Sequence, residues 1–192
     1  MLAKGSINWI LMPLVIAVGA WLLKLYPITV IGVIMTAFFT IFFRDPERVA
    51  PRDGMASPAD GVVLQAGEKV SIFMRFRDVH VNRAPISGVV KKIEHKKGEH
   101  RPAFSKGSSE NEQNRITIET EYGEVIVTQI AGILARRIVC HVKEGEVIAK
   151  GQRIGMVRFG SRVEVTIPDA FNVVVKKGDR VRAGGSIIAR LV

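Results

Sequence analysis

The sequence predicts a mainly β fold, namely a barrel-sandwich-like β domain preceded by an N-terminal α-helical hairpin. Three observations support this prediction. Two long apolar runs open the chain, short runs rich in Val and Ile follow them, and the last third contains an internal repeat. We therefore expect a membrane-anchoring hairpin over 1–43 and a β domain over 44–192.

The N-terminal segment contains two charge-free runs, 5–23 and 25–43, each 19 residues long and separated only by Lys24. Each run has about the length that a helix needs to cross a ~30 Å hydrocarbon layer. A cleaved signal peptide would have a shorter apolar core and no second run. A pair of buried helices in a soluble protein is the other alternative. The pattern favours a membrane hairpin.

Basic residues indicate the orientation of this hairpin. Lys4, Arg44, Arg48 and Arg52 lie on the side where both ends of the hairpin meet, whereas Lys24 is alone at its tip. Cytoplasmic segments next to membrane helices carry the excess of Lys and Arg. We therefore expect the protein at the cell membrane, with the β domain on the cytoplasmic side.

The formal net charge of the chain is +10. Such an excess suits either nucleic acid or an anionic membrane surface. The basic residues are scattered among the expected strands, and no aromatic-rich binding motif accompanies them. Together with the hairpin, this distribution favours an anionic membrane surface as a partner and argues against nucleic acid. The single cysteine, Cys140, excludes an internal disulfide and is typical of a reducing compartment.

After residue 43, a charged linker broken by prolines leads into a series of short β runs, in which helical periodicity is weak. The runs share a richness in Val and Ile and are bounded by Gly, Pro, Asn or charged residues. They are 61–65, 70–76, 89–94, 115–119, 124–130 and 138–142. Tyr122-Gly123 reads as a hairpin turn, and segment 96–114 has no strand pattern.

A further strand is expected over 156–165, where apolar and charged residues alternate. Gly160-Ser161 lies in the middle of this strand, although glycine weakens a strand interior. One interpretation is a β-bulge. The other is a reactive peptide bond, because a serine hydroxyl can attack the preceding carbonyl when the backbone is strained.

The internal repeat relates 142–146 to 175–179 at an offset of 33 residues, and it also relates Gly151 to Gly184. Each copy reads V-K-x-G-acid. Repeats of this kind resemble those of biotinyl and lipoyl carrier domains. No lysine suited to carry a prosthetic group stands between the two copies, which leaves a membrane-anchored, lipoyl-like adaptor without catalysis as one alternative function.

Several spaced motifs occur together in the part of the chain from Phe42 onward. They are F-F-R-D-P-E-R at 42–48, S-P-A-D-G at 57–61, D-V-H-V-N-R-A-P at 78–85, Q-I-A-G at 129–132 with A-R-R-I-V at 135–139, and R-F-G-S-R at 158–162. In this order they resemble the short, membrane-anchored form of the phosphatidylserine decarboxylase family.

The resemblance implies a proenzyme that cleaves itself between Gly160 and Ser161, giving a β chain of 1–160 and an α chain of 161–192. Ser161 would become an N-terminal pyruvoyl group, the only cofactor expected, with no metal. This group would accept the electrons freed when a serine phospholipid loses CO2 and becomes the ethanolamine phospholipid. The substrate is phosphatidylserine or archaetidylserine, and the sequence leaves the lipid tails open.

The resemblance also implies roles for individual residues. Asp60 and Ser161 match an Asp-His-Ser arrangement for self-cleavage, and His80 matches an acid or base at the reacting carbon. Longer bacterial members have a second histidine where this chain has Arg83, so the base for self-cleavage stays open. Arg83 would instead hold the lipid phosphate or carboxylate. The adjacent Arg136 and Arg137 are either a solvated pair or residues that would face the anionic headgroup. These roles would make the β domain, 44–192, the catalytic domain.

The remaining histidines, His95, His100 and His141, are weaker candidates, and their spacing does not suggest a metal site. The oligomeric state is also open, since an exposed strand edge would allow a homo-oligomer.

Overall fold

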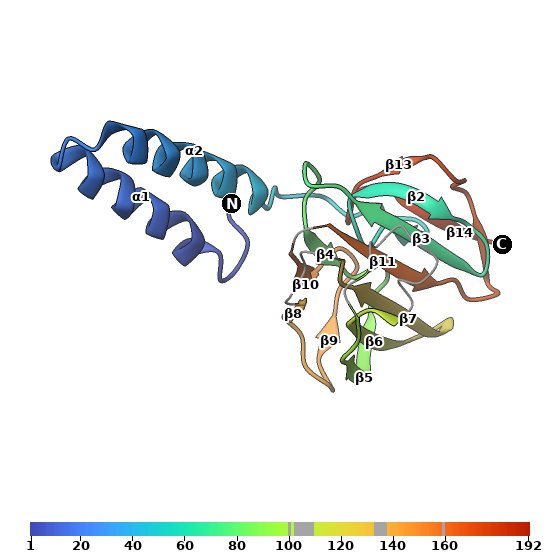
Figure 1. Cartoon of the computed structure of the whole chain (residues 1–192). Helices are drawn as coiled ribbons and strands as arrows, with labels where there is room; N and C mark the ends of the chain where they lie inside the picture. The colour runs from blue at the N-terminus through green and yellow to red at the C-terminus, as the bar shows by residue number, and fades with distance from the viewer. Residues whose placement is uncertain (100, 102–109, 133–137, 159) are drawn as a thin grey trace. The chain divides into compact units, whose positions relative to one another are not determined.

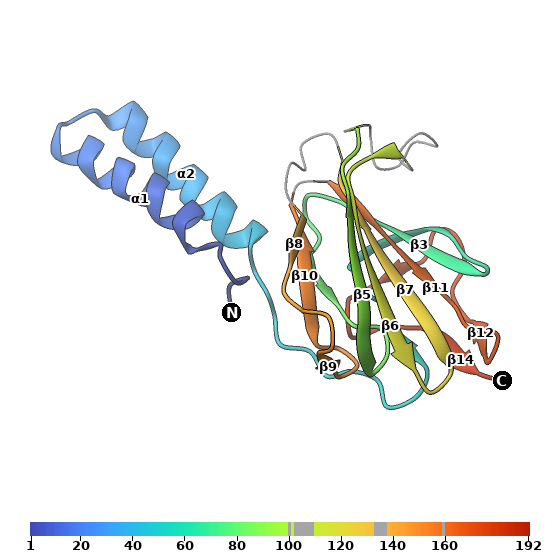
Figure 2. The ribbon, with the colours of Figure 1, turned by 90° about the horizontal axis from the view of Figure 1, so that it is seen from below.

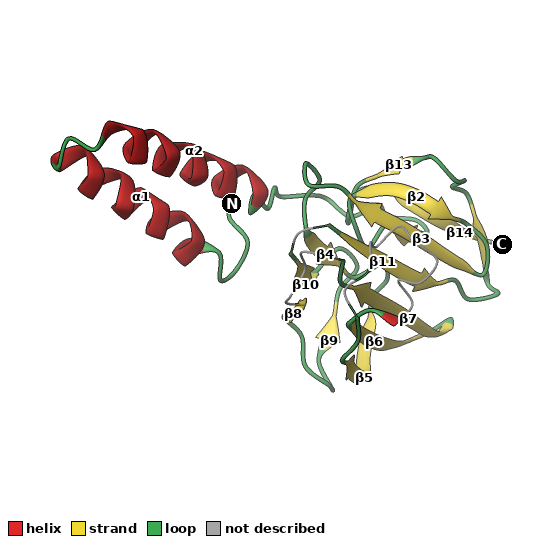
Figure 3. Cartoon of the chain, viewed as in Figure 1, coloured by secondary structure: helices red, strands yellow, loops and turns green. Residues whose placement is uncertain are grey.

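The computed structural model describes residues 1–192 except 100, 102–109, 133–137 and 159. The chain divides into two compact units, Met1–Glu47 and Arg48–Val192. The first is helical and the second is built of strands, as Figure 3 shows by colour. The prediction of a mainly β fold with an N-terminal helical pair is confirmed.

The helical unit consists of α1 (Ile7–Leu22) and α2 (Tyr26–Phe42), joined by a turn in which Lys24 adopts a positive φ of 59°. The helices approach closely at Gly32, where an added Cβ would lie 2.8 Å from the Ala17 Cβ. The predicted helical hairpin is therefore present. Within the described residues, neither helix combines the length and the apolar character needed to cross a membrane, so the membrane hairpin is not confirmed.

The second unit is built from short strands. Those that precede the Gly160-Ser161 bond are β1 (Met55–Ala56), β2 (Gly61–Gln65), β3 (Lys69–Met74), β4 (Val81–Arg83), β5 (Gly88–Lys96), β6 (Gln113–Thr120), β7 (Gly123–Ile130), β8 (Ile138–Cys140), β9 (Val147–Ile148) and β10 (Arg153–Val157). Those that follow it are β11 (Ser161–Thr166), β12 (Phe171–Val173), β13 (Arg180–Val181) and β14 (Ile187–Leu191).

These strands form one large sheet and two small ones (Figure 1). The large sheet is eight-stranded, in the order β13-β2-β3-β11-β7-β6-β5-β9, and it curls into a half-barrel. The small sheets have the orders β4-β10-β8 and β1-β14-β12. Figure 2 shows the long strands β5, β6, β7 and β11 side by side, with β8 and β10 beyond them. The inward residues of these strands form one hydrophobic core.

The internal repeat predicted from the sequence is present as two equivalent turns. The Gly145 N–H donates to the Val90 carbonyl at 2.7 Å, and the Gly178 N–H donates to the Val63 carbonyl at 2.9 Å. Both glycines have positive φ, which suits a residue without a side chain. Each turn therefore packs on an equivalent strand, near opposite edges of the eight-stranded sheet.

The prediction of one strand over 156–165 is wrong. Residues up to Val157 belong to β10 in a three-stranded sheet, whereas Ser161 begins β11 in the eight-stranded sheet. Gly160 has a φ of 63°, a conformation that breaks an extended strand. Gly160-Ser161 therefore lies where the chain passes from one sheet to the other, and it is not a bulge within a ladder.

The segment 96–114, expected to lack strands, contributes to two of them at its ends. Lys96 is the last residue of β5, while Gln113 and Asn114 open β6. Part of the segment lies outside the described residues. The predicted turn at Tyr122-Gly123 is confirmed as the connection between β6 and β7, with Gly123 at a φ of 102°.

Candidate active site

Ser161 is the first residue of β11, and it is fully buried, with 0% of its surface exposed. Its hydroxyl has no hydrogen-bond partner among the described residues. A buried polar group without a partner costs about 1–3 kcal/mol, so such groups usually indicate stored strain or a chemical role. The buried hydroxyl of Ser71 on β3 is in the same state, so what distinguishes Ser161 is its place directly after Gly160, where the chain passes from one sheet to the other.

Gly160 precedes Ser161 with its backbone in the left-handed region, where most side chains are strained. An added Cβ would meet no atom within 4 Å. A side chain would fit in the space at this position, so the reason for a glycine here is the positive φ. The peptide bond to Ser161 thus begins from a conformation that an L-residue with a side chain would rarely adopt.

His80 is buried directly before β4, close to the same connection. Its carbonyl accepts a hydrogen bond from the Val157 N–H at 3.4 Å, and Val157 is the last residue of β10. The ring Nδ1 lies 2.9 Å from the Asp78 carbonyl, which can only accept. Nδ1 therefore carries the proton in the neutral ring, and Nε2 is the nitrogen that can take up a proton.

Asp60 is held in a buried ion pair immediately before β2. Arg48 contacts both carboxylate oxygens, with Nη2 to Oδ2 at 2.8 Å, and Nη1 contacts Oδ1. The Ala183 N–H donates to Oδ1 at 2.7 Å, and Arg48 Nη1 donates to the Ala183 carbonyl at 2.8 Å. Arg48 and Ala183 thus fix the position of the Asp60 carboxylate.

The predicted Asp-His-Ser residues lie at one end of the sheet. Among the described residues, however, the Asp60 carboxylate bonds to Arg48 and Ala183 and not to His80 or Ser161. β3 lies between β2 and β11, and Ser161 pairs with Met74 at the end of β3. Two strand spacings place the starts of β2 and β11 about 10 Å apart. The carboxylate itself is paired with Arg48, so the assignment of Asp60 to self-cleavage stays a prediction.

Arg83 is buried, with 4% of its surface exposed. Its Nη1 donates to the Gly151 carbonyl at 3.2 Å. An added Cβ on Gly184 would lie 2.7 Å from the Arg83 Cδ. The side chain therefore packs between the two glycines that the repeat relates, and its predicted contact with the lipid stays untested.

The other candidates lie away from this group. Arg136 and Arg137 fall outside the described residues, as does His100. His95 is exposed and lies 3.1 Å from the Glu112 carboxylate. His141 is half-buried. The described residues contain no group of His, Cys, Asp and Glu side chains placed to hold a metal ion.

A small hollow of about 330 Å³ adjoins Asp60. Asp78, Arg180 and Arg182 also line it, so charges of both signs face the space. Asp78 both lines this hollow and holds the His80 ring through its backbone carbonyl, so this one residue links the hollow to the histidine.

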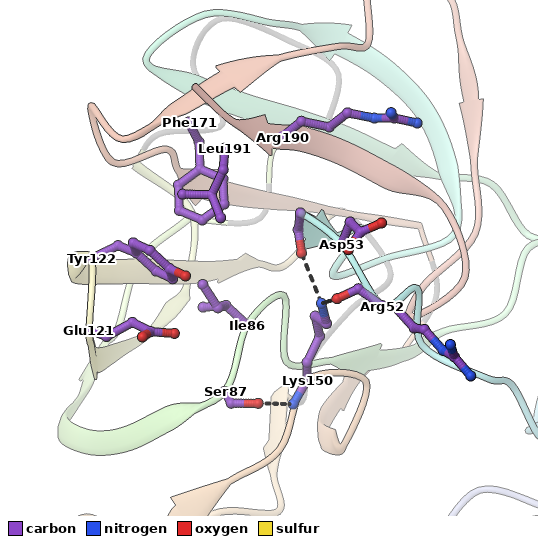
Figure 4. Close-up of a pocket in the computed structure, with 11 residues that line it drawn as sticks. Arg52, Asp53, Ile86, Ser87, Glu121, Tyr122, Lys150, Phe171, Arg190 and Leu191 are labelled. Carbon is purple, nitrogen blue, oxygen red and sulfur yellow. Dashed lines mark hydrogen bonds between the residues drawn. The ribbon is translucent and has the colours of Figure 1, made fainter.

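A larger hollow of about 520 Å³ lies at the opposite end of the sheet (Figure 4), beside the β6–β7 turn. Tyr122 packs edge-to-face on Phe171 at 5.0 Å there. Partial burial and the Glu121 carboxylate raise the pKa of the Tyr122 hydroxyl. The Lys150 Nζ donates to two backbone carbonyls, those of Arg52 at 2.8 Å and Gly54 at 3.1 Å.

Sequence reasoning missed several buried polar residues near Ser161. The sequence marks Arg48 only as a charge near the membrane and as part of a family motif, and it predicts no chemistry for Asn82, Asn114 and Gln129. A usable signal was present for two of them, because Asn114 and Gln129 occupy the inward positions of strands whose other inward residues are Ile or Val. A polar residue in the core phase of an alternating strand needs an explanation.

Comparison with known proteins identifies the class. The phosphatidylserine decarboxylase family model matches residues 35–69 and 64–189. A protein of Methanosarcina barkeri named archaetidylserine decarboxylase proenzyme is 50% identical, covering 100% of this chain and 99% of the relative. A Halobacterium salinarum protein of the same name is 44% identical over 99% of this chain and 100% of the relative.

A bacterial relative, the phosphatidylserine decarboxylase proenzyme of Carboxydothermus hydrogenoformans, is 45% identical over 80% of each chain. These matches, together with the buried serine at the junction of two sheets, identify the chain as an enzyme, a decarboxylase, and not as a non-catalytic adaptor. The chain belongs to the phosphatidylserine decarboxylase family.

Proposed function

We propose that this chain decarboxylates a serine phospholipid to the ethanolamine phospholipid after cleaving itself between Gly160 and Ser161. The observation that carries the proposal is the state of Ser161, whose buried hydroxyl lacks a hydrogen-bond partner among the described residues and follows a glycine in the left-handed region. The proenzyme names of the relatives support the same conclusion.

In the proposed self-cleavage, the Ser161 Oγ attacks the Gly160 carbonyl carbon and gives an ester as the peptide C–N bond breaks. Elimination across the Cα–Cβ bond of Ser161 then releases the new C-terminus at Gly160. Hydrolysis of the resulting dehydroalanine consumes water, releases ammonia and leaves a pyruvoyl group. Ser161 fits this outcome because its hydroxyl is buried and is not held by a hydrogen bond from a described residue.

The pyruvoyl group supplies an electron sink for the carbon that loses CO2. Around it, His80 is the residue placed to hold and move a proton, since its Nδ1 is fixed by the Asp78 carbonyl and Nε2 is the basic nitrogen. Asp60 and Arg48 tie the β chain to the α chain through the Ala183 backbone. This contact would keep the cleaved chains together.

The substrate is a phospholipid with a serine headgroup, phosphatidylserine or archaetidylserine. The relatives from Methanosarcina and Halobacterium, which match over almost the whole chain, are named for archaetidylserine. We therefore place archaetidylserine first. The serine headgroup reacts in the same way in both lipids. The tails therefore determine only the kind of membrane in which the substrate is found.

We also propose that the protein works at the cytoplasmic face of the cell membrane. Large apolar side chains on both helices are more than half exposed, an arrangement that suits contact with lipid. They include Met12, Val15, Trp21, Leu22, Val30, Ile31 and Ile34. The net charge of +10 would favour an anionic lipid surface. Membrane fractionation with and without residues 1–43 tests this placement.

The function is tested by adding wild-type protein and Ser161→Ala to vesicles that contain either serine lipid. Wild type should form the ethanolamine lipid, and Ser161→Ala should form none because it has no hydroxyl to cleave the chain or to become the pyruvoyl group. Mass spectrometry of the extracted lipids measures both. Decarboxylation by Ser161→Ala at the wild-type rate would contradict the proposal.

A further inference from the structure

Three buried side-chain amides lie near Ser161 and have no part in the function proposed so far. They belong to Asn82 on β4, Asn114 on β6 and Gln129 on β7, with exposed fractions of 0%, 3% and 0%. Burying an amide is costly unless it is hydrogen-bonded. Three of them close together in an otherwise apolar core therefore call for a reason beyond packing.

The amides form one directed series of hydrogen bonds that joins the two sheets. Asn114 Nδ2 donates to Gln129 Oε1 at 2.9 Å, and Gln129 Nε2 donates to Asn82 Oδ1 at 2.7 Å. Asn82 Nδ2 then lies 3.5 Å from the Met74 sulfur. Because each amide accepts with its oxygen and donates with its nitrogen, the series fixes Asn82 with its NH2 group toward Met74.

Met74 brings this donor next to Ser161. The two residues are direct partners in the β3–β11 ladder, and both side chains are fully buried. Side chains directly opposite in an antiparallel pair lie on one face, with Cβ atoms about 4.5–5.5 Å apart. The amide series therefore ends at the side chain that lies opposite Ser161 in the ladder.

The backbone around the series leaves room for it at Gly155. This residue pairs with Asn82 in the β4–β10 ladder. A Cβ added to Gly155 would lie 2.9 Å from Gln129 Nε2 and 2.4 Å from the Val139 carbonyl. The absent side chain allows Gln129 to reach Asn82 across the gap between the sheets.

We infer that Asn82 is the hydrogen-bond donor that stabilises the oxyanion of self-cleavage, and that Gln129 and Asn114 are positioning residues that keep its NH2 group turned toward Ser161. The inference rests on the proposed self-cleavage. A thioether is a weak acceptor, so the donor is held in place without being strongly bound.

During the acyl shift, the Ser161 Oγ bonds to the Gly160 carbonyl carbon and the carbonyl oxygen takes the negative charge. When the C–N bond breaks, the Ser161 nitrogen receives the proton that the hydroxyl gave up. An oxyanion is a much stronger acceptor than sulfur. The Asn82 donor would therefore exchange Met74 for the oxyanion as the charge develops.

The test measures the half-life of the precursor for wild type, Asn82→Asp and the charge-free Asn82→Ala, by denaturing gel and intact mass. Both variants lose the donor, and each should process about 100-fold more slowly, the usual cost of removing one oxyanion donor. Gln129→Glu cannot donate to Asn82 and should show a smaller slowing. Processing of both Asn82 variants at the wild-type rate would overturn the inference.

Hydroxylamine separates a role in the acyl shift from a role in the later elimination, because it cleaves an accumulated ester but not a peptide bond. If Asn82 acts on the acyl shift, the ester never accumulates in its variants and hydroxylamine gives no additional cleavage. Rapid cleavage of Asn82→Ala by hydroxylamine would show that the shift is intact and would overturn the inference.

Two control variants accompany the series. Met74→Leu keeps the packing and removes only the resting acceptor, so it should process at least as fast as wild type. Ser71→Ala removes a different buried hydroxyl, that of the β3 residue whose ladder position is opposite Glu164, and should have no effect. Slow processing of Met74→Leu would contradict the inference. A wild-type chain that stays whole would instead overturn the proposed self-cleavage itself.

Discussion

The two ends of the eight-stranded sheet differ in how they treat polar groups. At the end where β11 begins, Ser161, His80 and Asp60 are buried in or beside the core. At the other end, beside the β6–β7 turn, the larger hollow is lined by residues such as Lys150 and Glu121 that face solvent or backbone. Figure 2 shows these ends at the top and the bottom of the sheet.

The larger of the two hollows is therefore not the one that marks the candidate active site. The 520 Å³ space is large, but its lysine is satisfied by two carbonyls. The Ser161 end carries the cost, namely a buried hydroxyl without a described partner that directly follows a glycine at positive φ. Costs of this kind persist in a fold when they serve a reaction.

Among the variants that test the difference between the two ends of the sheet, Asp60→Asn should have the largest effect. The change leaves the Arg48 guanidinium without its ionised partner, and both side chains are only about one-eighth exposed, at 12% and 13%. Self-cleavage should slow about 100-fold if Asp60 takes part in proton transfer. The free energy of unfolding should fall by about 3 kcal/mol, the lower end for breaking a buried ion pair.

Precursor half-life and urea denaturation measure these two effects. Asp169→Asn, an exposed carboxylate in the turn before β12, is the matched control and should change neither. An Asp60→Asn chain that loses stability but processes normally would assign Asp60 to holding the chains together and remove it from the self-cleavage group.

An intermediate effect is expected from Gly155→Ala, which tests whether the packing around the amide series matters. The new Cβ would lie 2.4 Å from the Val139 carbonyl, so β8 and Gln129 must move. Overpacking of this kind costs about 1–3 kcal/mol, measurable by thermal unfolding. Self-cleavage should slow about 10-fold, because small misplacements of reacting groups are costly.

Gly67→Ala is the matched control for that variant, since a Cβ at Gly67 would meet no atom within 4 Å. It should process as wild type does. Equal self-cleavage rates for Gly155→Ala and Gly67→Ala would mean that the packing at Gly155 does not affect the site.

The smallest effect on processing is expected at the opposite end, from Lys150→Met. The variant loses the hydrogen bonds to the Arg52 and Gly54 carbonyls, which should lower the free energy of unfolding by about 1–2 kcal/mol. Because the site is remote from Ser161, the precursor half-life should stay within about twofold of wild type. A large slowing would mean that the two ends are coupled.

Much of the fold could be predicted because strand alternation is a local signal. The run 61–65 coincides with β2, and 124–130 differs from β7 only at its first residue. The repeat was visible because two equivalent turns need the same glycine and acidic residue. Local patterns could not separate β10 from β11, because the apolar and charged residues alternate in the sequence across the junction, whereas the positive φ of Gly160 is not visible in that pattern.

The site was predictable only in part, for a similar reason. Motifs placed Asp60, His80 and Ser161 in one functional group, but they gave no information on partners far away in the sequence. The pairing of Asp60 with Ala183 spans 123 residues. The contact from Gln129 to Asn82 joins two different sheets. Such contacts depend on the tertiary fold, which no short stretch of sequence specifies.

The central claim is self-cleavage at Gly160-Ser161, and the intact mass of purified wild-type protein under denaturing conditions tests it most directly. The account predicts two chains, one ending at Gly160 and one of 161–192 that begins with a pyruvoyl group in place of Ser161. A single unmodified chain of 192 residues, after time for processing, would contradict it.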